Sequence, residues 1–137
     1  MTPDPRKRVG RAALLYVGLR CFTALAELIK GTATIEEWHD VCEAMNGVEV
    51  LCTMGKIDSA KFMPIVIKAQ QGMVQASRNQ QATGTMTLSS ESHLFAIREC
   101  VTEYESAIGR FSQWTIAQAS AEVVMRTARA KPEEVTA

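Results

Sequence analysis

Glycine, proline and aromatic residues are scarce in this sequence. Its 137 residues include 8 glycines, 4 prolines and 6% aromatic residues, whereas 47% are hydrophobic. This composition excludes collagen-like and low-complexity chains, and it excludes a disordered chain, which would have too few apolar residues to form a core. The length fits one domain of about 100–150 residues. The low content of aromatic residues favours helices over strands.

An excess of charge of either sign is also lacking. The chain has 15 Lys and Arg residues and 15 Asp and Glu residues, so its formal net charge is zero. A function that depends on a strong overall field is therefore excluded. The charges are nevertheless unevenly distributed: a basic N-terminal arm, residues 1–10, leads into the first apolar segment, and no Lys or Arg lies between Gly31 and Gly55.

Closely spaced cysteines are missing. None of the four cysteines stands in a CxxC pair, which excludes the common zinc and thioredoxin-like motifs. Each lies within an apolar helical pattern, where a free cysteine behaves as a small buried hydrophobic residue. We therefore expect a reducing, cytoplasmic location, no disulfides and no bound metal or cofactor. The four residues are Cys21, Cys42, Cys52 and Cys100.

Apolar residues at helical spacing predict four long helical segments, over about residues 11–30, 34–54, 59–81 and 90–131. No strand pattern and no internal repeat is visible. Each boundary has a recognisable end signal. These signals are Gly31 and Gly55 after the first two segments, a Thr34–Glu37 capping box, Asp58 before the third, and Ser89 or Ser90 before the last.

The last segment is open to two interpretations. It either continues through Gly109 as one helix of about 40 residues, or it breaks near residues 109–112 into two helices. The expected fold is therefore all-α, an antiparallel bundle of four long helices, or of five if the break occurs. The bundle domain is expected to comprise residues 11–131, followed by a short tail, residues 132–137.

The first helix is apolar over most of its circumference, which predicts that it lies at the centre of the bundle. Arg20 and Glu27 lie inside this segment, and charges are costly in the centre of a bilayer. No small-residue cleavage site of the signal-peptide type follows it. We therefore expect a buried core helix and no contact with a membrane. One face of this helix consists of Ala12, Leu15, Leu19, Phe22, Ala26 and Ile29.

Apolar residues alternate at spacings of three and four along the last segment, which is the pattern of a heptad seam. An unbroken last helix would extend beyond the shorter helices and leave part of this seam uncovered. A second copy of the chain would cover it, so the sequence predicts a homodimer. The expected interface comprises Tyr104, Ile108, Phe111, Trp114, Val124 and Met125.

Glu49 falls at the centre of the apolar face of the second helix. A buried carboxylate must be paired or protonated, and Arg20 of the first helix is the obvious candidate partner. A buried Arg20–Glu49 pair would fix the register of the two helices. The competing reading, a carboxylate tuned for acid–base chemistry, lacks a second catalytic group.

Two charged surfaces are candidate binding sites. Glu36, Asp40 and Glu43 follow one another at helical spacing opposite the apolar face, and we expect this acidic face to be exposed and available to a basic protein partner. The alternative site is the basic N-terminal arm, which could reach into a nucleic acid groove, although no basic recognition helix accompanies it. The basic residues are Arg6, Lys7, Arg8 and Arg11.

Catalytic constellations find little support in the sequence. There are 2 histidines, no nucleophile elbow and no phosphate-binding loop. Glu36 and His39 form a single Glu-x-x-His half-motif, whereas a di-iron site needs two copies and two more glutamates. We therefore expect no enzymatic activity and no catalytic residues.

The sequence contains Trp38, the run Ala44-x-Asn46-x-x-Glu49-x-Leu51, and the pairs Met54-Gly55 and Tyr104-Glu105. These residues resemble those of small all-helical proteins of unknown function carried by proteobacterial phages and plasmids. The resemblance implies no activity. It implies an accessory protein of a mobile element that binds host machinery, such as a defence system, and modulates or inhibits it. Together with the preceding observations, it leads us to expect a protein-binding module, with a nucleic-acid-binding regulator as the alternative.

Overall fold

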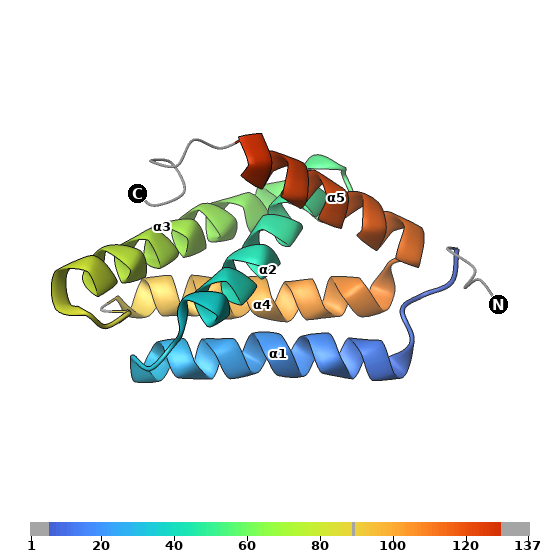
Figure 1. Ribbon diagram of the computed structural model, residues 1–137. Helices are drawn as coiled ribbons and strands as arrows, with labels where there is room; N and C mark the ends of the chain where they lie inside the picture. The colour runs from blue at the N-terminus through green and yellow to red at the C-terminus, as the bar shows by residue number, and fades with distance from the viewer. Residues whose placement is uncertain (1–5, 89, 130–137) are drawn as a thin grey trace.

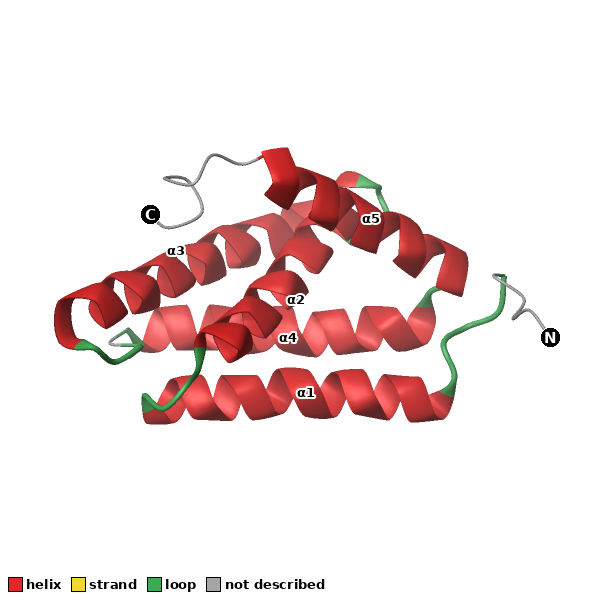
Figure 2. Ribbon diagram, in the orientation of Figure 1, coloured by secondary structure: helices red, strands yellow, loops and turns green. Residues whose placement is uncertain are grey.

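The computed structural model describes residues 6–88 and 90–129, with side chains up to residue 126. Within these residues the chain forms five α-helices and no strand (Figures 1 and 2). The all-α bundle is confirmed, in its five-helix form. The predicted tail, residues 132–137, lies outside the described residues. The helices are α1 (Arg11–Lys30), α2 (Ile35–Thr53), α3 (Ser59–Thr83), α4 (Glu91–Arg110) and α5 (Gln113–Arg129).

The predicted end signals act as expected. Thr34 Oγ1 accepts a hydrogen bond from the Glu37 amide at 3.2 Å, and the Glu37 carboxylate accepts one from the Thr34 amide at 2.9 Å, which completes the capping box. Asp58 caps α3 and Ser90 caps α4, because the side chain of each accepts a hydrogen bond from the amide three residues later. Gly31 ends α1 with a left-handed φ of 78°.

The break in the last segment falls at Phe111 and Ser112, at the end of the range considered from the sequence. Phe111 is extended, with φ −94° and ψ 160°. Ser112 Oγ then accepts a hydrogen bond from the Thr115 amide at 3.2 Å and so begins α5. The helix after the break packs mainly against α2.

The central helix is α2, and the prediction that the first helix occupies the centre is wrong. α2 contacts each of the other four helices, and it crosses the front of α4 obliquely in Figure 1. Its Val41, Met45, Val48 and Leu51 are almost completely buried. By contrast, α1 lies at one side of the bundle, antiparallel to α4 and beside it.

The inner face of α1 is its small-residue face. Gly18, Cys21 and Ala24 are buried together with Leu25 and Leu28. A Cβ atom added at Gly18 would lie 2.9 Å from Oε1 of Glu105 on α4. Small side chains on this face therefore allow close approach of α1 to α4, and this contact turns the opposite face of α1 outward.

Candidate interaction surfaces

The outer face of α1 carries an exposed apolar stripe, which we call the α1 stripe. Leu19 is 70% exposed, Leu15 61%, Ile29 48% and Phe22 37%. No charged residue interrupts the stripe along these positions. Sequence reasoning found this face but assigned it to the core. The α1 stripe comprises Ala12, Leu15, Leu19, Phe22, Ala26 and Ile29, all exposed.

In length and composition α1 also meets the requirements for a membrane-crossing helix, alone among the helices of the described residues. Its two internal charges are both engaged within the fold. Arg20 turns toward α2, and the Glu27 carboxylate lies 3.6 Å from Lys30 Nζ and accepts a hydrogen bond from Thr32.

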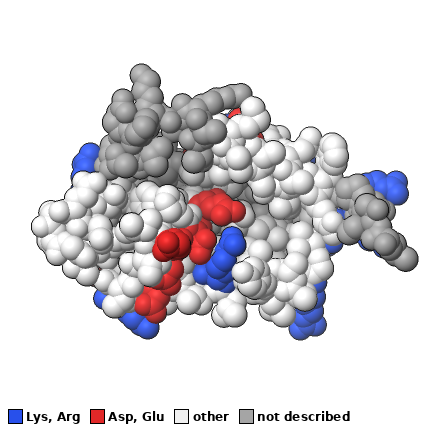
Figure 3. Space-filling view, viewed as in Figure 1, with Lys and Arg blue, Asp and Glu red and all other residues white. Residues whose placement is uncertain are grey.

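Arg20 pairs with the acidic face of α2. Its Nε lies 3.7 Å from Asp40 Oδ1, and its Nη2 lies 3.7 Å from Glu43 Oε2. Partial burial disfavours the charged guanidinium, but the two carboxylates outweigh that effect, so the pKa of Arg20 is raised. Figure 3 shows the acidic side chains as a band over the middle of this face with basic atoms beside them.

The acidic face is therefore only partly available to a partner. Glu36 and Glu43 are exposed, whereas Asp40 is half-buried. The expectation of exposure is correct for Glu36 and Glu43 and wrong for Asp40, because α1 lies alongside α2 and brings Arg20 to Asp40 and Glu43.

The predicted Arg20–Glu49 pair does not form. Asp40 and Glu49 are about two and a half helical turns apart, so they point to opposite sides of α2, and Arg20 reaches only the Asp40 side. The Glu49 side chain is 29% exposed, so it is not fully buried either.

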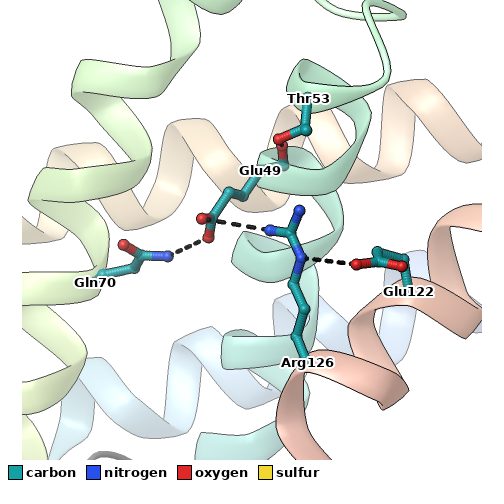
Figure 4. A network of polar contacts seen from close by, with 5 residues as sticks. All are labelled: Glu49, Thr53, Gln70, Glu122 and Arg126. Carbon is teal, nitrogen blue, oxygen red and sulfur yellow. Dashed lines mark hydrogen bonds and ion pairs between the residues drawn. The ribbon is translucent and has the colours of Figure 1, made fainter. Parts of the chain in front are cut away.

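Glu49 instead joins α2 to α3 and α5 (Figure 4). Gln70 Nε2 donates a hydrogen bond of 2.7 Å to one Glu49 carboxylate oxygen. Arg126 Nη1 lies 3.6 Å from the other oxygen, and Arg126 Nε donates to Glu122 at 3.2 Å. The network therefore fixes α5 on the side of α2 that faces away from α1.

The interface predicted on the last segment is divided by the break. Ile108 is buried, and Tyr104 and Phe111 pack against the core of the same chain. Ile108 is therefore covered within the monomer, whereas Tyr104 and Phe111 are half-buried and their part in an interface between two copies stays a prediction. Three residues on α5 remain exposed and their role stays a prediction: Trp114, Val124 and Met125.

The basic arm is attached to the α4–α5 junction by its backbone. The Gln113 amide donates to the Lys7 carbonyl at 2.8 Å, and Gln113 Nε2 donates to the Arg8 carbonyl at 3.2 Å. The side chains of Arg6, Lys7, Arg8 and Arg11 are exposed. The arm is thus held against the domain from residue 7, whereas a groove-entering arm would extend away from it.

The thiols of Cys21, Cys42 and Cys100 and the hydroxyl group of Tyr104 belong to residues that are buried or packed against the core. Burial raises the pKa of the Cys42 and Cys100 thiols to about 12 and that of Cys21, despite the nearby Arg20, to about 11. Burial is also the main reason that the pKa of Tyr104 is raised to about 12. Neutral thiols are poor nucleophiles. Within residues 6–88 and 90–129 no three His, Cys, Asp or Glu side chains are grouped so that they could hold a metal ion.

No known protein family, curated protein or solved structure matches this chain.

Proposed function

We propose that this protein is a non-enzymatic interaction module whose contact surface is the α1 stripe. The observation that carries this proposal is the exposure of Leu15, Leu19, Phe22 and Ile29 on one helix face. Single exposed apolar residues are ordinary, but a contiguous apolar patch indicates an interaction site. The fold has a core without these residues, so they are free to serve a partner.

Several polar side chains of the bundle hold helices together, which supports a role without catalysis. Glu49, Gln70 and Arg126 connect three helices, and Trp38 Nε1 donates a hydrogen bond of 3.0 Å to the Met73 carbonyl of α3. An acid–base role for Glu49 would need a second catalytic group beside it, and its contacts are an amide and a guanidinium.

We further propose that the partner belongs to the machinery of a host cell that this accessory protein modulates or inhibits. This part rests on the resemblance to proteins of phages and plasmids. The residues that carry the resemblance include Trp38, Leu51 and Tyr104, which here pack between helices. We assign to these residues the packing of the fold, and to the surface residues the binding of the partner.

Affinity capture from a bacterial lysate tests the proposal. The wild-type chain, Leu19→Glu and the control Ile67→Glu are immobilised, and the retained proteins are identified by mass spectrometry. Ile67 on α3 is 50% exposed, so its substitution adds the same charge elsewhere. We expect Leu19→Glu to lose proteins that the wild type and the control retain. Equal retention by all three chains would contradict a contact through the α1 stripe.

A further inference from the structure

The α1 stripe repeats at alternating spacings of three and four residues, which places it on a heptad seam. Large and small side chains alternate along it in a particular order. From the N-terminal end the order is Ala12, Leu15, Leu19, Phe22, Ala26 and Ile29. Ala12 is therefore the first residue of the seam, and Ala26 is the last but one.

We propose that a second copy of this chain packs antiparallel on the α1 stripe. This inference rests on the proposed function: the second copy covers the stripe in the free protein, and a host partner that binds there would displace it. Reversing the direction of the second helix pairs Leu19 of each copy with Phe22 of the other, and the two-fold axis passes between these layers. The outer layers then pair Leu15 with Ala26 and Ala12 with Ile29.

Side-chain size favours the antiparallel arrangement. In each outer layer a large residue meets an alanine, so the helices keep an even separation and fill the space between them. A parallel pair would bring Ala12 against Ala12 and Ala26 against Ala26, leaving gaps, while Phe22 would meet Phe22 between them. The antiparallel pair is also isologous, so one patch serves both copies and the assembly closes at two.

The charge in the middle of α1 does not oppose a second copy on the stripe, because Arg20 turns toward the acidic face of α2. The acidic face of α2 lies beside α1, with Asp40 and Glu43 held there by Arg20. The register places Arg11 of each copy at the level of Lys30 of the other, at the two ends of the seam, where both residues are exposed to solvent.

Sedimentation equilibrium of the full chain tests the dimer. We expect the wild type and Ile67→Glu to approach twice the chain mass of 15.0 kDa at micromolar concentration. Leu19→Glu should raise the dimer dissociation constant at least tenfold. A wild-type mass of 15.0 kDa at every concentration would overturn the proposal. Loss of lysate partners by Leu19→Glu in a monomeric wild type would overturn the dimer and leave the proposed function standing.

Cysteine cross-linking tests the register. A mixture of Leu15→Cys and Ala26→Cys chains should form a disulfide dimer under mild oxidation. Each variant alone should not, because its two cysteines would lie about 16 Å apart along the helix axis. The wild-type chain is the control, since three of its native thiols are buried and that of Cys42 is half-buried. Cross-linking of Leu15→Cys alone would overturn the antiparallel register. Binding of a monomeric wild type to phosphatidylcholine–phosphatidylglycerol vesicles would assign the stripe to a membrane and overturn the proposal.

Discussion

The ring of Tyr104 on α4 lies directly against the backbone of Gly47 on α2. A Cβ atom added at Gly47 would lie 2.6 Å from Cε1 and 2.9 Å from Cδ1 of that ring. Real Cβ atoms do not approach a ring so closely. Gly47 therefore sets how near the central helix can come to α4, and Tyr104 belongs to the core of the monomer.

Gly47→Ala should lower the free energy of unfolding by about 1–3 kcal/mol, the usual effect of overpacking. In an uncrowded helix the same change would raise it by about 1 kcal/mol. Gly109→Ala on α4 is the matched control, because the nearest atom there is the tip of the flexible Leu14 side chain, at 3.1 Å. Urea unfolding measures both. A Gly47→Ala chain as stable as the control would contradict the close contact.

Glu49→Ala should lower the free energy of unfolding by about 1 kcal/mol, the usual contribution of one hydrogen bond. The loss is modest because Glu49 is partly exposed and Arg126 keeps Glu122 as a partner. Glu122→Ala is the comparison and should cost only about 0.3–0.5 kcal/mol, as for other pairs one helical turn apart. A loss of several kcal/mol in Glu49→Ala would mean that a buried charge had been left unpaired.

Alkaline pH should destabilise the fold. In the unfolded chain thiols titrate near pH 8.5, whereas in the folded chain the pKa of Cys42 and of Cys100 is about 12. The folded state thus holds more protons in this window. Its stability is full below about pH 8.5 and falls as pH rises toward 12.

The free energy of unfolding should therefore decrease steadily between pH 8 and pH 10, by up to about 1.4 kcal/mol per pH unit for each fully buried thiol. Cys100→Ala, measured over the same range, should show a shallower slope. A flat profile in the wild type, or the same slope in both chains, would mean that the thiols are not protected by burial.

Charge reversal at Glu36 and at Asp40 of the acidic face should have different effects on the free energy of unfolding. Glu36→Lys should lower the free energy of unfolding by no more than about 1 kcal/mol, the helix-dipole effect of an exposed charge in the first turn of α2. Asp40→Lys should destabilise the chain more, because it places a second positive charge against Arg20. Added salt should reduce the difference. Equal stability of the two variants at low salt would contradict the Arg20–Asp40 contact.

Local chemistry made the helix boundaries predictable. The Thr34–Glu37 capping box and the glycine after Lys30 act over a few residues, so the sequence contains all that determines them. The break at Phe111 was harder to predict, because the Ser112 cap of α5 is supported by Lys7, whose carbonyl accepts from the Gln113 amide. That contact joins residues far apart in the sequence.

The inward face of α1 could not be predicted in the same manner. Leu14, Gly18, Cys21, Leu25 and Leu28 also follow spacings of three and four, so α1 has two apolar seams. Periodicity alone does not indicate which of the two seams is buried. Packing against α4 and α2 selected the seam with the smaller side chains, which allows close approach. The larger seam was left outside, where it forms the candidate site.

Hydroxyl-radical footprinting over a dilution series tests the central claim, that the α1 stripe is a protein contact surface occupied by a second copy. The measured quantity is the oxidation rate of each exposed side chain. The account predicts that Leu15, Leu19 and Phe22 become protected as concentration rises from nanomolar to high micromolar. Ile67 and Phe95, which are exposed on other helices, should keep constant rates. Oxidation of Leu15, Leu19 and Phe22 that does not change with concentration would contradict it.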